Sequence, residues 1–521
     1  MKSFVHKNRY YITLGVLFLI ALFLRGYRLA TLPDMIHIDE AGLGCNAWCI
    51  ANFGVDRYLN EMPFYAENYN YSGQSPLYTY STALLITTIG KGHLSLLLAR
   101  IPGFLASMLV VIFGTKSMDL AFQNRKITLL SAALLTICPY FIMHGRFALD
   151  CNLMLGCSTV ALYLLLKYIR SQKLLDLVLC GIAFGIILYS YALSYFLLPM
   201  FLILITLYLL YTGKITFRRS IVWACSVCIT GLPVILFACS LLFKLEPIHF
   251  LGFVISPIAS DRMSDVANYN FFENIKNIIQ ITLTHDSYLF DATDKFYTMY
   301  VISIPFILIG FFYSAGKLFL SIKNRSFHVS AIYWIFYICG LITNGLTSVY
   351  YVYHGNFCFI SYLYFLVSGI YATYRFVRPY RYAFLGILSA CYLLWGLSFC
   401  RYYFGIYTLT DAYTSLYIPP YGEVVADAHN LESAQDIYID SHGKMEYFYF
   451  FYPESPYEVS FDRSTKEQGR YHFEIDSDTP IETGNAYIIS RKNESFINRL
   501  MVSGMDYERV DYECYYLFYL K

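Results

Sequence analysis

Long apolar runs alternate with short polar connections along the first 400 residues. A helix that crosses a bilayer needs about 20 largely apolar residues, and fewer where it packs inside a bundle. About eleven runs meet this requirement, at residues 10–29, 100–115, 127–143, 153–168, 175–190, 195–211, 221–243, 296–315, 329–347, 356–371 and 382–399. The pattern predicts a mainly α, polytopic bundle of about 11 transmembrane helices.

The basic residues of the short connections predict the orientation of these helices, because such loops stay on the cytoplasmic side. Lys and Arg precede the first run and recur in every second connection after it, at Lys2, Lys7, Arg9, Lys116, Arg125, Lys126, Arg170, Lys173, Lys214, Arg218, Arg219, Lys317, Lys323, Arg325, Arg375, Arg378 and Arg381. This holds only if the short apolar run 75–90 does not cross, so we expect it to form a helix in the outer interface. If it crossed, most later basic loops would lie outside. The N-terminus is then cytoplasmic, and loops 30–98 and 244–295 face outward.

Beyond residue 400 the pattern changes. Charges return, and short β-rich stretches at 436–439, 486–489 and 515–518 alternate with expected helices at 421–431 and 494–502. We therefore predict a transmembrane module at 1–400 and a small extracytoplasmic α/β domain at 401–521.

Composition supports lipid as the main solvent. Hydrophobic residues make up 57% of the chain and charged residues 14%, and the mean hydropathy is +0.48. The 38 basic and 36 acidic residues nearly cancel, so no nucleic-acid partner is expected. Cys45 and Cys49 can share one helix face, but core packing is favoured over a metal or disulfide role. No small-residue cleavage site follows the first run, which predicts a retained anchor in a bacterial plasma membrane.

Two adjacent carboxylates, Asp39 and Glu40, follow the first apolar run. A sugar joined to a lipid phosphate already has a stable anionic leaving group. Its transfer therefore needs a base for the incoming hydroxyl and cations for the phosphate. Asp39 suits the base, with Glu40 beside it as a second candidate catalytic residue. The plainer interpretation is a solvated surface pair.

Several short motifs in the first half of the chain occur in a similar order in one known family. They are Pro33 to Asp39-Glu40, Gly54-Val55-Asp56-Arg57-Tyr58, Gly73-Gln74-Ser75-Pro76-Leu77-Tyr78, Arg100-Ile101-Pro102 and His144-Gly145-Arg146-Phe147-Ala148-Leu149-Asp150-Cys151-Asn152. This organisation resembles the GT-C glycosyltransferases, in particular the family 39 group of protein O-mannosyltransferases and lipid A aminoarabinose transferases. The resemblance implies that Asp39 is the catalytic base and that Arg146 lies near the site. It also implies inverting transfer of a sugar from a polyprenyl-phosphate donor to a hydroxyl or amine, on an acceptor left open as glycan, lipid or protein.

Five arginines are candidates to bind the donor phosphate or sugar: Arg25, Arg28, Arg57, Arg100 and Arg146. Arg25 and Arg28 lie at the outer end of the first helix, where few cations are expected. Snorkelling to lipid headgroups is their alternative role, and a structural ion pair with Asp150 is the alternative for Arg146.

His354 and Asn356 open the tenth helix from outside and are further donor-binding candidates. Relatives often carry a basic residue near an asparagine here, whereas this chain has a histidine, which weakens phosphate contact at neutral pH. Helix capping is the alternative for Asn356. Asp39 and Glu40 can hold a divalent cation with the donor phosphate. The resemblance covers metal-assisted and metal-free members alike, so the metal site is undecided.

Loop 244–295 carries Asp261-Arg262 and His285-Asp286 and is long enough to form a lid. A transporter or lipid flippase of cell-envelope glycan precursors is the alternative function. It should show ionisable residues near helix midpoints or interrupted helices in matching halves. The apolar runs are almost free of charge at their centres, which favours the transferase. A non-catalytic scaffold would not need so many helices.

Overall fold

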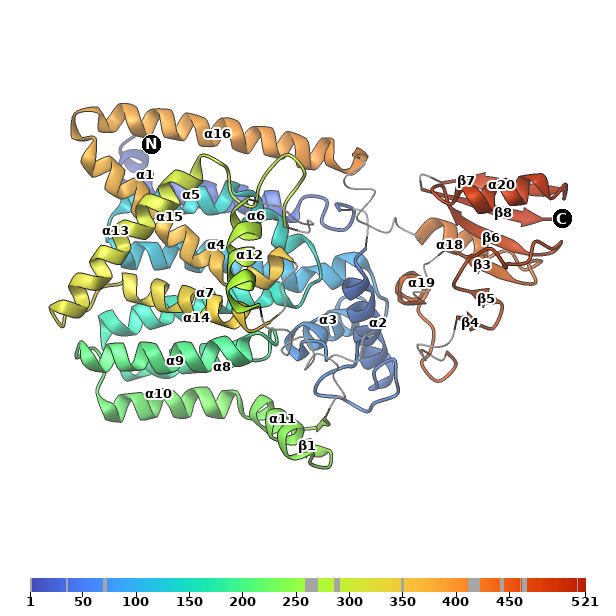
Figure 1. The fold of residues 1–521 in the computed structure, drawn as a ribbon, viewed down its shortest axis with the longest axis horizontal. Coiled ribbons are helices and arrows are strands. Elements are labelled where there is room, and N and C mark those ends of the chain that lie inside the picture. The colour runs from blue at the N-terminus through green and yellow to red at the C-terminus, as the bar shows by residue number, and fades with distance from the viewer. Residues whose placement is uncertain are drawn as a thin grey trace. The chain divides into compact units, whose positions relative to one another are not determined.

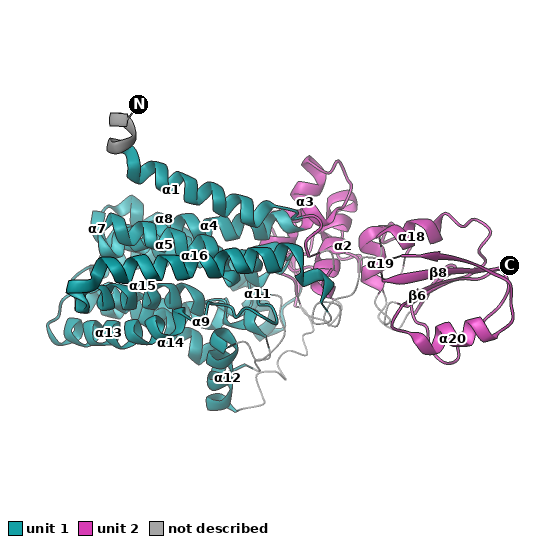
Figure 2. Cartoon of the chain, turned by 90° about the horizontal axis from the view of Figure 1, so that it is seen from above, with its two compact units in different colours: residues 1–29, 100–246, 260–416 teal, residues 30–99, 247–259, 417–521 magenta. Residues whose placement is uncertain are grey.

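The computed structural model describes residues 2–33, 36–68, 73–257, 270–284, 291–347, 351–410, 422–440, 445–459, 461, 466–512 and 514–521. The chain folds into two compact units, coloured in Figure 2. The first contains Met1–Leu29, Arg100–Glu246 and Ser260–Leu416, and the second contains Ala30–Ala99, Pro247–Ala259 and Tyr417–Lys521. The predicted outer loop that carries Asp39 therefore belongs to the same unit as the C-terminal region.

Helices that lie side by side build the first unit (Figure 1). They are α1 (Lys2–Gly26), α4 (Leu96–Phe122), α5 (Arg125–Ile137), α6 (Pro139–Met143), η1 (His144–Arg146), α7 (Cys151–Ser171), α8 (Leu174–Ile187), α9 (Ser194–Tyr211), α10 (Phe217–Thr230), α11 (Leu232–Phe243), α12 (Phe271–Thr284), α13 (Ser303–Lys323), α14 (Ser330–Gly345), η3 (Val352–Gly355), α15 (Cys358–Phe376), η4 (Arg378–Tyr380), α16 (Arg381–Gly405) and η5 (Tyr407–Leu409).

Within the described residues, six helices are long and apolar enough to cross a membrane, or up to eight if each of two bent pairs is one span. The pair α5 and α6 bends by 66° and the pair α10 and α11 by 71°. Pro139 and Pro233 lie at the start of the second helix of each pair. There, the missing N–H and fixed φ of proline interrupt the preceding helix.

Each predicted apolar run coincides with a helix or a bent pair. The largest difference is at the run 296–315, where α13 begins only at Ser303. Pro305 lies in its first turn, where proline is tolerated, and this position favours a helix start just before it. The mainly α, polytopic membrane fold is confirmed.

The second unit begins with α2 (Ile38–Phe53), α3 (Pro76–Thr88) and the antiparallel pair β1 (Ile248–Phe250) and β2 (Phe253–Ile255). α3 covers the run predicted to lie in the interface. Its 13 residues extend about 20 Å, less than the roughly 30 Å hydrocarbon core. Gly54 ends α2 in the left-handed region, at φ 72°.

The C-terminal part of the second unit is a small α/β domain. Its helices are α18 (Gly422–His429), α19 (Met445–Phe451) and α20 (Glu494–Val502), and its strands are β3 (Ile437–Ile439), β4 (Glu467–Gln468), β5 (Tyr471–His472), β6 (Ala486–Ser490), β7 (Tyr507–Asp511) and β8 (Tyr515–Leu520). The sheet has the order β4-β5-β3-β6-β8-β7, with β3 parallel to β5 and β6 and the other pairs antiparallel. The apolar face of α20, with Phe496, Ile497 and Leu500, packs on this sheet. The predicted α/β character of the C-terminal region is confirmed.

Candidate functional site

Asp39 and Glu40 lie in the first turn of α2 but have different environments. Nδ1 of His37, the N-cap residue, accepts a hydrogen bond from the Asp39 backbone N–H at 3.1 Å. Oε2 of Glu40 accepts one from the His37 backbone N–H at 3.1 Å, which completes a capping box. Glu40 is fully buried, whereas the side chain of Asp39 is 37% exposed. Of the two carboxylates, Asp39 is the one open to an incoming acceptor.

The carboxylate of Asp39 has two polar neighbours within its unit. Nδ2 of Asn68 donates to Oδ1 of Asp39 at 3.4 Å, and Oδ2 lies 3.5 Å from Nδ1 of His37. Nδ1 of His37 already accepts a hydrogen bond from the Asp39 backbone N–H, so the proton of the neutral ring lies on Nε2. The approach of Oδ2 of Asp39 to Nδ1 therefore adds no hydrogen bond. Among the described residues of this unit, no Lys or Arg pairs with Asp39. The N-terminal end of α2 instead favours its negative charge.

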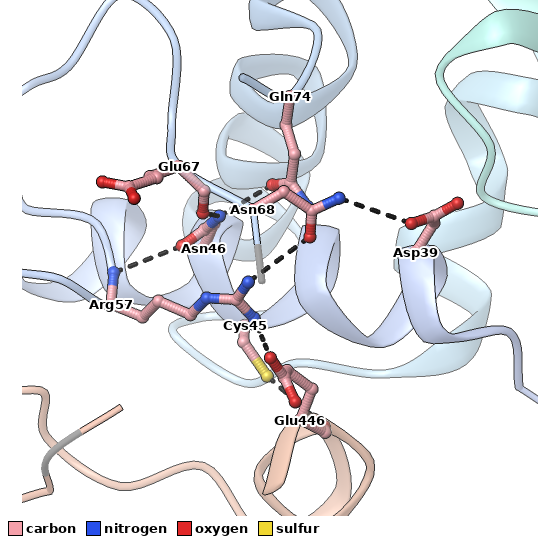
Figure 3. A network of polar contacts seen from close by, with 8 residues as sticks. All are labelled: Asp39, Cys45, Asn46, Arg57, Glu67, Asn68, Gln74 and Glu446. Atoms are coloured by element: carbon pink, nitrogen blue, oxygen red, sulfur yellow. Dashed lines mark hydrogen bonds and ion pairs between the residues drawn. The ribbon is translucent and has the colours of Figure 1, made fainter. Parts of the chain in front are cut away.

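Arg57 is fully buried, and Asn68 lies between it and the Asp39 carboxylate (Figure 3). Its Nη2 donates to Oδ1 of Asn68 at 3.4 Å, and its Nη1 lies 3.4 Å from Oε1 of Glu446 on α19. Burial acts to lower the pKa of Arg57, but Glu446, Tyr58, Cys45 and Asp56 together outweigh burial and raise the pKa. The structure thus brings Asp39 and Arg57 together through Asn68. Contact between Arg57 and donor phosphate stays a prediction.

A second set of buried amides fixes the backbone around Arg57. Asn46 Oδ1 accepts from the Arg57 backbone N–H at 3.2 Å. Its Nδ2 donates to the Glu67 carbonyl at 2.9 Å and to Oε1 of Gln74 at 2.7 Å. α2 is therefore tied both to the turn at Arg57 and to the segment that leads into α3.

Cys45 and Cys49 lie on the buried side of α2, and both are free thiols. Burial raises the pKa of Cys49 to about 12 and that of Cys45 further. The thiols stay protonated at neutral pH and pack as small apolar groups.

In the first unit, Arg25, Arg100 and Arg146 gather at the C-terminal end of α1, and all three are fully buried. Arg146 donates from Nη1 to the carbonyls of Leu24 at 3.1 Å and Arg25 at 2.8 Å, and from Nη2 to that of Tyr27 at 2.7 Å. Arg100 donates to the Leu29 carbonyl at 3.2 Å. These guanidinium groups satisfy carbonyls that the helix end leaves open.

Arg25 is held from three sides. Its Nε donates to Oγ of Ser107 at 2.8 Å, its Nη2 to the Leu135 carbonyl at 2.7 Å and its Nη1 to the Ala21 carbonyl at 3.2 Å. Snorkelling to lipid headgroups, the alternative role for Arg25, does not fit a side chain that is fully buried in this network, and its contact with donor phosphate stays a prediction. Arg28, in contrast, is exposed, at a φ of 52° where the chain turns away from α1. Among these arginines, Arg28 is the exposed residue.

Asn356 joins three segments of the first unit. Its Oδ1 accepts a short hydrogen bond from the Tyr140 hydroxyl, and its Nδ2 donates to the Cys151 carbonyl at 2.9 Å. It therefore bridges α6 and α7, and the N-cap of α15 is Phe357 instead. The carbonyl of His354 accepts from Nδ2 of Asn344 at 3.3 Å, and its ring packs edge-on against Tyr353. Donor contact by either residue stays a prediction.

Sequence reasoning missed Asp291, in the predicted outer loop 244–295. This carboxylate is 1% exposed, and neither of its oxygens has a hydrogen-bond partner in the described part of the chain. Burial raises its pKa to about 7. The only sequence signal was an acidic residue in an aromatic-rich segment. The lid residues predicted instead, Asp261-Arg262 and His285-Asp286, lie outside the described residues.

The described residues do not fit a divalent metal site. No three His, Cys, Asp or Glu side chains within them are grouped as such a site requires. Glu40 is buried in the helix cap, so it does not share a ligand position with Asp39.

Comparison with known proteins gives a family match over part of the chain. A family model described as dolichyl-phosphate-mannose-protein mannosyltransferase matches residues 73–239. This segment runs from the approach to α3 into α11, covers less than half of the chain and does not include Asp39. No curated protein sequence matches this chain.

The structure of ArnT from Cupriavidus metallidurans bound to undecaprenyl phosphate matches with a TM-score of 0.54 and 13% identity, over 98% of each chain. The same protein in its apo state has a TM-score of 0.54 and 13% identity, over 100% of this chain and 98% of that one. The oligosaccharyltransferase AglB from Archaeoglobus fulgidus, in complex with an inhibitory peptide and a dolichol-phosphate, has a TM-score of 0.48 and 16% identity, over 92% of this chain and 62% of that one. The predicted resemblance to the GT-C membrane glycosyltransferases is confirmed, and the chain has their fold.

Proposed function

We propose that this chain transfers one sugar from a polyprenyl-phosphate donor to a hydroxyl or amine of an acceptor at the outer face of the membrane. The observation that carries the proposal is the exposed carboxylate of Asp39 at the N-terminal end of α2. It is the position that the resemblance assigns to the base, and the partly matched family model and the GT-C fold support the same class of reaction.

In the proposed step, Asp39 takes the proton of the acceptor hydroxyl as its oxygen attacks the anomeric carbon of the sugar. The new C–O bond forms on the face opposite the phosphate. The old bond from the anomeric carbon to the phosphate oxygen breaks, and its electron pair leaves with the polyprenyl phosphate. The configuration at the anomeric carbon is thereby inverted. Because the leaving group is already an anion, no strong general acid is needed.

The donor phosphate is proposed to contact Arg28, an exposed residue whose guanidinium offers a planar fork for phosphate oxygens. Arg25, Arg100 and Arg146 would shape that end of α1 through their carbonyl contacts. The polyprenyl tail would lie against the apolar helices that follow α7. The proposed orientation has a cytoplasmic N-terminus, and the membrane is a bacterial plasma membrane.

The test is the transfer of radiolabelled sugar from undecaprenyl phosphate by the purified full-length chain in detergent, with membrane fractions as acceptor. A panel of donors carrying mannose, glucose, galactose or arabinose covers hexoses and pentoses. The unaltered chain is compared with Asp39→Asn and with Glu61→Gln, which removes an exposed carboxylate of the same loop. Binding of undecaprenyl phosphate itself is followed by thermal shift, since a ligand that binds the folded state raises its stability.

We expect Asp39→Asn to abolish transfer while lipid binding remains, and Glu61→Gln to transfer normally. Analysis of the labelled product would then identify the acceptor, and the anomeric configuration would test inversion. The proposal is wrong if the unaltered chain consumes none of the donors, or if Asp39→Asn transfers sugar as well as the unaltered chain.

A further inference from the structure

Helix α19 of the C-terminal region packs directly on α2, the helix that carries Asp39. Sγ of Cys45 lies 3.6 Å from the Glu446 carbonyl. A Cβ at Gly44 would overlap the ring of Phe450, so glycine allows the two helices to approach this closely. Glu446 is 8% exposed and Phe450 is 2% exposed, as expected for a packed interface.

An ion pair also joins α19 to the turn that follows α2. Nη1 of Arg57 lies 3.4 Å from Oε1 of Glu446, and both side chains are almost completely removed from solvent. A buried charge requires compensation, and losing one partner leaves the other charge uncompensated. Glu446 is the carboxylate that pairs with the Arg57 side chain among the described residues of this unit.

The hydrogen bond from Arg57 indicates which way the side-chain amide of Asn68 points. An amide has one end that accepts hydrogen bonds and one that donates them. Nη2 of Arg57 approaches Oδ1 of Asn68 at 3.4 Å, and a guanidinium can only donate. The NH2 group of Asn68 therefore faces the other way, where it donates to Oδ1 of Asp39 at 3.4 Å. Figure 3 shows the resulting chain of four side chains.

Gly42 makes room for this chain on α2. A Cβ at Gly42 would lie 3.1 Å from Oδ1 of Asn68 and 3.2 Å from Nη1 of Arg57. The side chains of Arg57 and Asn68 thus lie against the backbone of the helix, one turn from Asp39.

We propose that Glu446 is a positioning residue: through Arg57 and Asn68, the C-terminal domain holds Asp39 in the orientation that its role as base requires. The inference rests on the proposed function of Asp39. It makes the C-terminal domain part of the machinery that moves the proton, in addition to any part it has in acceptor access. The three contacts of 3.4 Å are long hydrogen bonds or ion pairs, so their loss should slow the reaction without abolishing it.

The test compares Glu446→Gln, Glu446→Asp, Asn68→Ala and the double variant Glu446→Gln with Asn68→Ala in the full-length chain. Glu458→Gln, which removes an exposed carboxylate of the same region, is the matched control. We expect Glu446→Gln to lower kcat about ten-fold with little change in the donor KM, and Glu446→Asp to restore part of the loss. The double variant should be no slower than Asn68→Ala, because both changes interrupt the same chain.

A second measurement does not depend on activity. Hydrogen exchange of the amides at the start of α2 should become about ten-fold faster in Glu446→Gln than in Glu458→Gln, because the helix start is less restrained. Additive losses of kcat in the double variant, or unchanged exchange at the start of α2, would overturn the inference. If Asp39→Asn is inactive and Glu446→Gln is fully active in the transfer assay, the proposed function of Asp39 stands and the positioning role of Glu446 is wrong.

Discussion

Asn68 donates a hydrogen bond from Nδ2 to Oδ1 of Asp39 at 3.4 Å. Asn68→Asp keeps the size of the side chain and an acceptor for Arg57, but it replaces the donor facing Asp39 by a second negative charge. We expect kcat to fall at least about ten-fold, since a lost donor and a like charge each cost on the order of 1 kcal/mol or more. Kinetics of sugar transfer measure the change. Asn52→Asp, at an exposed position near the end of α2, should be close to normal, and equal rates for both variants would contradict the prediction.

Arg28 should act on donor binding and not on stability. Its side chain is exposed, so Arg28→Gln removes a charge without opening the core, and surface changes of this kind usually alter stability by less than about 0.5 kcal/mol. We expect the donor KM to rise about ten-fold and the Tm to stay unchanged. Arg28→Lys should restore part of the affinity. An unchanged KM in Arg28→Gln would remove Arg28 from the donor site.

Arg146, in contrast to Arg28, should affect stability and not donor binding. Its guanidinium reaches the carbonyls of Leu24, Arg25 and Tyr27 from two nitrogens. A lysine has a single ammonium group that cannot reproduce this fork. We expect Arg146→Lys to destabilise the chain by about 1–3 kcal/mol, seen as a lower Tm in detergent. If Arg146→Lys instead leaves the Tm unchanged and raises only the donor KM, Arg146 is a donor contact and not a structural residue.

Much of the fold was predictable because hydropathy locates the apolar helices and local periodicity locates the short elements between and beyond them. The helix α20 begins and ends at the predicted residues, and α3 lies within one predicted run. The capping role of Glu40 had a weak signal in the spacing from His37, three residues earlier. Histidine is not among the usual N-cap residues, so the sequence does not distinguish a capping role for Glu40 from that of a second catalytic candidate beside Asp39.

The contacts around Asp39 could not be predicted from the sequence. Cys45 and Glu446 are 401 residues apart, and nothing in the local pattern of either segment indicates that α2 and α19 meet. Arg25 shows the same limit, because sequence places it at a helix end but not against the Leu135 carbonyl. Such contacts depend on which helix faces pack together, and a single sequence does not contain that information.

Gly310 and Gly369 let α13 and α15 cross at close range. A Cβ at Gly310 would overlap the carbonyl oxygen of Phe365, and one at Gly369 would overlap that of Phe306. Small residues allow such backbone contact between membrane helices. We expect Gly310→Ala to destabilise the chain by about 1–3 kcal/mol or more, because the backbones must separate.

Gly316→Ala is the matched control on the same helix, since a Cβ there would have no neighbour within 4 Å. It should leave stability unchanged or raise it by up to about 1 kcal/mol, because alanine favours the helix. Thermal unfolding of both variants in detergent tests the pair. Similar Tm values for Gly310→Ala and Gly316→Ala would show that the crossing is looser than the structure indicates.

Asp291 predicts how stability depends on pH. Burial raises its pKa from 3.8 to about 7 in the folded chain. Between these values the unfolded chain has lost the proton and the folded chain keeps it, so stability falls as the pH rises from about 4 to about 7. The difference amounts to as much as about 4 kcal/mol.

Asp291→Asn stays neutral at every pH and should remove this dependence. The Tm of the variant should therefore exceed that of the unaltered chain at pH 8 by much more than at pH 5. Glu246→Gln, at an exposed position, should follow the unaltered chain. Parallel Tm curves for Asp291→Asn and the unaltered chain would mean that the Asp291 carboxylate has a partner that keeps it ionised when folded.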